Sequence, residues 1–439
     1  MDNSICEEII TSLKKSLLSV KAFEEFFINS IEVFLEKSEK FKKDYEIGIE
    51  IDDKLLPYAS DNARIAQEKI ENLQLSNKRK INDYLDINIS DKEGIRYSIV
   101  DKEVKNKEYV DPMIARFHKI KYSEYNKCME NAALNSLIVL FEDFLSDTYR
   151  LLVMHSPEKY FKSKQINLFD VIKAKDINDV INNQIDIEVE NKMFDAVKSL
   201  KEICSIEGIN KNENLVLDYE ELNARRNVCI HNRGMVNDKY LAVINNKNIR
   251  RGDFLETNLK YFEDAINLIY KIELSLVFEL CVKFDDEKDT FDWDNELSAI
   301  IFDDLLCDKK YNVCKHIYKI MSKCKNFDFE NRTMYRINYI NSCKQLNEKE
   351  EVEKELSNLD LSIAKKEFEI AKLCLQDKNK EAYDKIKEDY PKPYNAETIR
   401  DWPIFIDFRK SEYYSKLQEE YKSDFEIKTY EKTSINLIC

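Results

Sequence analysis

The stretch that decides the fold is "LNSLIVLFEDFLSDTYRLLVMH", residues 134–155. Its large side chains recur every three or four residues, which is the period of an α-helix with one buried face. This pattern predicts a long helix over about 122–154, which ends before Pro157 in "HSPEKY". The predicted inward stripe consists of Leu134, Leu137, Phe141, Leu145, Thr148 and Leu152.

Three more helices follow in the sequence, and together the four predict a helical bundle. One covers about 187–206, with Gly208 just after its end. Another covers about 217–232 and ends near Gly234, and the last covers about 258–282. Between these last two, "KYLAVINNKNIRRGDFLE" (239–256) suggests a small hairpin. The predicted inward residues are Phe194, Val197, Leu200 and Cys204, then Leu259, Phe262, Ile266, Ile269, Leu276 and Leu280.

The segments on either side have a different character. Residues 1–45 predict a helix, with Ile9, Ile10, Leu13, Leu17 and Leu18 at helical spacing. "EIGIEID" and "GIRYSIVDKEVKNKEYVDP" predict short strands or an extended connection, with a helix near 60–83. Beyond the acidic stretch "FDDEKDTFDWDNE" (284–296), residues 334–356 and 367–390 predict helix–turn–helix units, and Ala364, Ala371 and Ala382 alternate with larger residues. A last helix pair is expected around Trp402 and Tyr413.

The predicted fold class is therefore mainly α, in three parts. Residues 1–112 form a mixed N-terminal region, 113–283 a helical bundle, and 284–439 a repeat-like helical region. Only five Gly and six Pro occur in 439 residues, which argues against sandwiches and barrels because their many turns favour these residues.

Composition also limits the function. A net charge of −15 gives no general attraction to nucleic acid, so such a site needs a local basic patch. The eleven Cys form no CxxC pair, and the four His show no HExxH spacing, so we expect free thiols, no metal and no cofactor. A metal-dependent hydrolase is accordingly disfavoured. We find no signal peptide and no apolar run of 18 residues, and expect a cytoplasmic protein without membrane contact.

The candidate site lies in "ARRNVCIHNRG", residues 224–234. Asn227 and His231 are four residues apart and share a helix face, and the long side chain of Arg226 can swing over to them. Spacing alone is weak evidence, since Arg150 and His155 are equally far apart at the end of an apolar helix. We expect that second pair to lie at the rim of the bundle without a function.

These residue types suit phosphodiester chemistry. An imidazole can transfer a proton near neutral pH, and a guanidinium can hold a phosphate and stabilise its charge. The 2′-OH of RNA supplies a nucleophile, so such a site requires no metal. Further positive charge comes from Arg225, Arg233, Arg250 and Arg251. The competing interpretation is the polar end of a helix, with solvated Arg side chains.

"RNVCIHNRG" followed by "MVNDKYL" (226–241) resembles the signature of the HEPN superfamily, an Arg, a polar residue and a His spaced as R-x4–6-H. "LIVLFEDFLSDTYRLL" (137–152) resembles the first long helix of that family, and the resemblance covers about 122–283. It implies a bundle of four or five helices. Arg226, Asn227 and His231 match the motif in order and type.

The resemblance implies a metal-independent endoribonuclease, with a composite site across a homodimer and a 2′,3′-cyclic phosphate product. Arg226 would hold the scissile phosphate, His231 would be the acid or base, and Asn227 would orient His231 or the RNA. Many members are toxins or abortive-infection effectors, so we expect a role in anti-phage defence, with a phage-derived trigger or regulatory partner. The alternative is a non-catalytic HEPN or helical-repeat protein that serves as a binding or antitoxin-like scaffold.

Overall fold

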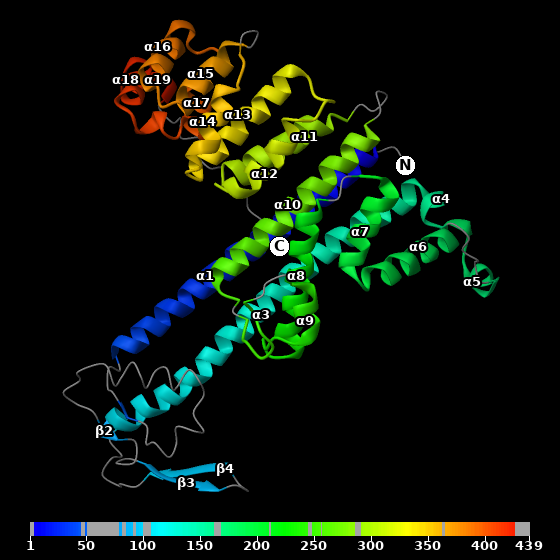
Figure 1. Ribbon diagram of the computed structural model, residues 1–439, viewed down its shortest axis with the longest axis vertical. Coiled ribbons are helices and arrows are strands. Elements are labelled where there is room, and N and C mark those ends of the chain that lie inside the picture. Colours follow the sequence, from blue (N-terminus) through cyan, green and yellow to red (C-terminus); the bar gives the residue numbers. More distant parts are fainter. Residues whose placement is uncertain are drawn as a thin grey trace, which may run out of the picture. The chain divides into compact units, whose positions relative to one another are not determined.

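The computed structural model describes residues 4–44, 49–50, 79–80, 85–90, 94–99, 107–161, 168–209, 212–244, 248–255, 257–285, 291–361 and 365–425. Nearly all of its elements are helices (Figure 1), so the mainly-α prediction is confirmed. The long helices are α1 (Ile5–Asp44), α3 (Lys107–His155), α8 (Glu213–His231) and α10 (Leu259–Phe284).

The strands are short and lie between α1 and α3 in the sequence. Strand β1 (Ile49–Glu50) pairs in parallel with β2 (Arg79–Lys80). Strand β3 (Leu85–Ser90) pairs antiparallel with β4 (Gly94–Ile99), which confirms extended structure in "GIRYSI". Most of the helix predicted near 60–83 lies outside the described residues. At Arg79–Lys80 that prediction is wrong, because these two residues pair as a strand.

The chain forms two compact units. Unit 1 comprises residues 1–18, 140–223 and 263–439, and unit 2 comprises 19–139 and 224–262. The boundaries drawn from the sequence, at 112 and 283, both fall inside helices, namely α3 and α10. The division of the chain into three functional regions stays a prediction.

Parts of all four helices of the predicted bundle lie in unit 1. Every residue of the α3 stripe from Leu134 to Leu152 is buried, and the ring of Phe141 lies edge-on to Tyr219 of α8 at 4.8 Å. On α10, Ile266, Ile269, Leu276 and Leu280 are buried as expected. The inward prediction is wrong at Leu259, which lies at the first turn of α10 and is 37% exposed. Leu18, which has helical spacing in α1, is 63% exposed.

The helix predicted over 187–206 is two helices. Helix α6 (Ile177–Met193) ends before Phe194, and α7 (Ala196–Glu207) starts after Asp195, whose carboxylate accepts a hydrogen bond from the Lys198 amide at 3.1 Å. Because this cap breaks the helical register, Phe194 is 95% exposed rather than inward. Leu200 and Cys204 are buried and Val197 is half-buried. Gly208 adopts the left-handed conformation (φ 65°) as predicted.

Three glutamates are buried inside unit 1, and one of them, Glu188, accepts a hydrogen bond from the Tyr149 hydroxyl at 3.3 Å. Glu207 of α7 accepts hydrogen bonds from Tyr160 (2.6 Å), Lys283 (2.5 Å) and Lys159 (3.1 Å). Burial would raise the pKa of Glu207, but these donors outweigh it and lower that pKa. Tyr160 belongs to the short helix α4 (Pro157–Tyr160), which is followed in sequence by α5 (Leu168–Lys173).

Glu273 of α10 has fewer hydrogen-bond donors around its carboxylate than Glu207 has. It is fully buried and accepts a hydrogen bond from the Ser16 hydroxyl at 2.6 Å, while its other oxygen has no partner among the described residues. Burial raises the pKa of Glu273 to about 8, although the Ser16 hydrogen bond acts in the opposite direction.

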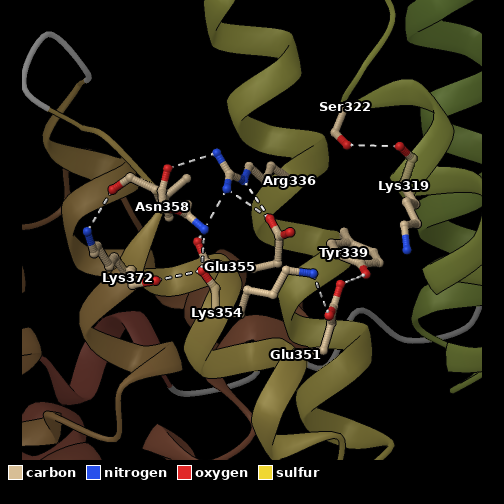
Figure 2. A network of polar contacts seen from close by, with 11 residues as sticks. Lys319, Ser322, Arg336, Tyr339, Glu351, Lys354, Glu355, Asn358 and Lys372 are labelled. Carbon is tan, nitrogen blue, oxygen red and sulfur yellow. Dashed lines mark hydrogen bonds and ion pairs between the residues drawn. The ribbon is translucent and has the colours of Figure 1, made fainter.

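The rest of unit 1 is a series of helical hairpins, as predicted for 334–356 and 367–390. Figure 2 shows how α13 is fastened to α14: Arg336 donates to Glu355 at 2.9 Å, and the Tyr339 hydroxyl donates to Glu351 at 2.8 Å. Ala371 and Ala382 are fully buried, whereas Ala364 lies outside the described residues. The helices are α11 (Trp293–Ile300), which continues as the π-helical segment η4 (Ile301–Leu306), α12 (Tyr311–Met321), α13 (Phe329–Gln345), α14 (Lys349–Ser357), α15 (Lys366–Leu375), α16 (Asn379–Asp389), α17 (Ala396–Asp401), the 3-10 turns η5 (Pro403–Phe405) and η6 (Phe408–Lys410), α18 (Glu412–Glu420) and α19 (Lys422–Phe425).

Three of these hairpins have the same turn. A left-handed residue occupies each one, namely Lys309 (φ 63°), Asn347 (φ 61°) and Asp377 (φ 59°). In each turn the next amide donates to the carbonyl five residues earlier, at 2.8, 3.0 and 3.0 Å respectively. Identical closure of successive helix pairs is typical of a helical repeat.

Candidate functional site

The sequence motif lies at the C-terminal end of α8, within unit 2. The helix ends at His231, and the chain then turns through two left-handed residues, Arg233 (φ 53°) and Gly234 (φ 80°). The amides of Asn232 and Gly234 both donate to the carbonyl of Val228, at 2.9 and 3.1 Å. The predicted end of the helix near Gly234 is therefore confirmed.

After this turn the chain forms a small cap. Residues 234–236 pair with 252–255: the Val236 amide donates to Asp253 at 2.8 Å, and the Leu255 amide donates to Gly234 at 2.9 Å. Between the two segments lies helix α9 (Asp238–Val243), where Asn237 accepts from the Tyr240 amide at 3.0 Å.

The predicted hairpin over 239–256 is thus wrong in its first half. The Asn237 cap starts a helix where the hairpin prediction placed a strand. The cap is held on α8 by a small apolar cluster of Val228, Val236 and Tyr240, with partly buried residues packed around it. This cluster fixes the 234–255 segment against the helix turn that contains the motif.

His231 is the most accessible group of the motif. Its side chain is exposed, and it forms no hydrogen bond or ion pair with any residue that the structure describes. A partner-free imidazole on the last helical turn can accept or donate a proton to a ligand.

Arg226 and Asn227 are linked to one another. Arg226 is half-buried, and its Nη1 donates to Oδ1 of the exposed Asn227 at 3.1 Å. Asn227 therefore orients Arg226 in this structure, whereas its predicted role was toward His231 or RNA. In an ideal helix, positions 226 and 231 differ by about 140° in direction and about 7.5 Å in height. One Arg and one His of a single chain therefore point to different sides of α8.

The four additional Arg residues differ in their surroundings. Arg225 is half-buried, with its guanidinium 4.0 Å from the centre of the Tyr261 ring and a hydrogen bond to the Tyr240 hydroxyl at 3.3 Å. Arg251 forms an exposed ion pair with Asp238 at 3.1 Å.

Arg233 and Arg250 are exposed, and within the described part of the chain neither forms an ion pair. Of the four cations, these two are the most available to an anionic ligand. The tyrosines that hold Arg225 were not predicted from the sequence, because they come from α9 and from the start of α10.

The second Arg/His pair, Arg150 and His155, contacts residues of neighbouring helices. Arg150 forms an ion pair with Asp186 at 2.5 Å, and the exposed His155 ring lies edge-on to Phe284 at 5.1 Å. His316 is half-buried in unit 1, where its Nε2 lies 3.0 Å from the Ser275 hydroxyl. Burial, with nearby Lys271 and Lys319, lowers the pKa of His316 to about 4.

Over the described ranges, no group of three or more His, Cys, Asp or Glu side chains could hold a metal ion. Nine cysteines in those ranges are free thiols, and seven of them are buried. In the same part of the chain, no helix has the length and apolar character needed to cross a membrane.

No protein-family profile matches this sequence, and no curated protein or solved structure is significantly similar to it.

Proposed function

We propose that this protein is a metal-independent endoribonuclease of HEPN type, acting as a homodimer in anti-phage defence or as a toxin. The observation that carries the proposal is the exposed His231 at the end of α8, which no described residue engages and which Arg233 adjoins in the turn. A helix end of purely structural use would not require an Arg, an Asn and a His in this order.

In the proposed reaction, His231 exchanges a proton with the 2′-OH or with the leaving 5′-oxygen of RNA. Arg226, held by Asn227, stabilises the charge on the scissile phosphate. The 2′-oxygen attacks phosphorus and the 5′-oxygen leaves with a proton, which gives a 2′,3′-cyclic phosphate. The reaction requires no metal.

A dimer would supply what one chain lacks. Acid–base cleavage uses both an acid and a base, and one chain offers a single His in the motif. A symmetric dimer would bring together two copies, so that each chain contributes its own His231 and Arg226.

The first experiment measures RNA cleavage in EDTA. Wild type should cleave, while Arg226→Ala and His231→Ala should each lose at least about a hundredfold in rate, the lower range for a general acid–base group. The matched control is His155→Ala, an exposed His that also ends a long helix, with the same spacing from an Arg. Cleavage that survives His231→Ala refutes the proposal. An equal loss of cleavage in His155→Ala would show that the effect is not specific to His231.

The second experiment tests the composite site. Excess His231→Ala protein mixed with wild type should suppress wild-type cleavage beyond simple dilution, because mixed dimers contain one imidazole. Activity proportional to the wild-type chains present would contradict a shared site. Product ends should resist ligation until the cyclic phosphate is removed enzymatically.

A second candidate function is a binding scaffold, and the hairpins of unit 1 favour it. A hollow of about 1300 Å³ is lined by residues of the second and third repeated turns, including Asn347, Glu348, Asp377 and Lys378. Expression in bacteria discriminates between the two functions. Growth arrest that is lost in His231→Ala favours the nuclease, whereas arrest that persists in this variant favours the scaffold.

A further inference from the structure

The cap beside the motif exposes two large apolar side chains. Met235 is 41% exposed and Phe254 is 55% exposed. They are bridge partners in the antiparallel pairing of 234–236 with 252–255. Directly opposed residues of an antiparallel pair project to the same side, so Met235 and Phe254 form one continuous apolar surface.

This surface, which we call the 235/254 platform, lies at the end of α8. The Asn232 side chain donates to the Met235 carbonyl, and the Met235 amide donates to the Asn232 carbonyl at 2.9 Å. A Cβ built on Gly234 would lie 3.9 Å from Cδ1 of Phe254. The Phe254 ring therefore covers the glycine of the turn that immediately follows His231.

The platform is accompanied by positive charge. Arg233 is in the same turn and Arg250 is three residues before Asp253 in the pairing segment, and both guanidinium groups are exposed and unpaired with respect to the described residues. The nearest acid along the chain, Asp253, accepts a hydrogen bond from the Arg250 amide at 2.7 Å. An exposed aromatic ring beside exposed Arg side chains is the composition of a surface for single-stranded nucleic acid.

We propose that the 235/254 platform stacks one unpaired base of RNA, while Arg233 and Arg250 contact the adjoining phosphates. This inference rests on the proposed ribonuclease function and deepens it, because it names single-stranded RNA as the substrate class. A paired base cannot offer its face to the ring, so duplex RNA should be a poor ligand.

Binding is measured in the His231→Ala background, so that the RNA stays intact. A short single-stranded RNA containing 2-aminopurine should lose fluorescence when that base stacks on Phe254. Phe254→Ala should weaken binding by about tenfold. Phe254→Leu keeps an apolar side chain over Gly234 without a π-face and should weaken binding similarly, whereas Phe254→Trp should retain it.

The matched control is Phe194→Ala, which removes a 95% exposed phenylalanine from the end of α6. It should leave binding unchanged. Wild-type affinity in both Phe254→Leu and Phe254→Ala overturns the platform, as does equal affinity for duplex RNA.

The two proposals fail in different ways. In cleavage assays with His231 present, Phe254→Leu should raise KM about tenfold and leave kcat within a few-fold. Cleavage that needs His231 but is indifferent to Phe254 overturns only the platform. Stacking that depends on Phe254, combined with cleavage that survives His231→Ala, overturns only the nuclease assignment.

Discussion

Glu273→Gln should stabilise the protein, and the gain should grow with pH. Glu273 is fully buried on α10 with one hydrogen bond, from Ser16, and its pKa is raised from 4.5 to about 8. The unfolded chain releases this proton near pH 4.5, while the folded protein keeps it until about pH 8. Folding stability therefore falls throughout that window and levels off above it.

The magnitude follows from the width of the window. Each pH unit between the folded and unfolded pKa values lowers the free energy of unfolding by ~1.4 kcal/mol. The free energy of unfolding of wild type should fall relative to that of Glu273→Gln by roughly 3 kcal/mol at pH 7 and by about 5 kcal/mol above pH 8. The amide is neutral at every pH, and its oxygen can still accept the Ser16 hydrogen bond.

Urea denaturation followed by circular dichroism, at pH values from 5 to 9, measures this difference. The midpoints of wild type and Glu273→Gln should be close at pH 5 and should diverge steadily to pH 8. Glu263→Gln is the control, because Glu263 is exposed on the same helix and should show no such divergence. Parallel pH profiles for wild type and Glu273→Gln would refute the reasoning.

Two further predictions concern stability. Lys309→Gly should raise the free energy of unfolding by about 1 kcal/mol, because Lys309 is left-handed (φ 63°) and a lysine is strained there. Asn347→Gly should gain less, since Asn tolerates this conformation, so equal gains in thermal unfolding would contradict the strain argument. Glu207→Ala should cost about 2 kcal/mol or more, because it leaves Lys159 and Lys283 without their shared carboxylate. Since the pKa of Glu207 is lowered, the wild-type advantage should disappear as the pH falls below 4.5, and a pH-independent difference would exclude the charge as its cause.

Helical periodicity was sufficient to predict the elements that build the core. The stripe from Leu134 to Leu152 is buried throughout, because α3 has a neighbour along this face. Periodicity was less informative at two single positions. Leu259, at the first turn of α10, and Leu18, within α1, both continue the apolar pattern but are exposed. Periodicity identifies the side of a helix that faces inward, but it does not show how far neighbouring elements cover that side.

The larger errors in the predicted helix boundaries lie at short polar residues that cap helices. Asp195 caps α7 and Asn237 caps α9, and in both places an apolar pattern had suggested another structure. Each side chain accepts an amide hydrogen bond three residues later, which is a recognisable sequence signal for a helix start. As helix starts, Asp195 divides the helix predicted over 187–206, and Asn237 excludes the first strand of the predicted hairpin.

The position of the candidate site could be predicted from the sequence, but the contacts of its side chains with other segments could not. The sequence placed Arg226, Asn227 and His231 on one helix that ends near Gly234, and the structure has them there. The contacts of Arg225 with Tyr240 and Tyr261, and the pairing of Met235 with Phe254, depend on how 234–262 folds back. No local pattern contains that information.

The recurring turn of the C-terminal hairpins bears on how the chain could change in length. Asn347 and Asp377 occupy equivalent places 30 residues apart, and each closes a helix pair by the same backbone hydrogen bonds. A duplication or deletion that begins at one of these places and ends at the other inserts or removes a whole helix–turn–helix step. The new junction would then join segments of matching backbone conformation. A change in length between two equivalent turn positions would therefore keep the hairpins in register, whereas a change that is not a whole helix–turn–helix step would misalign the turns.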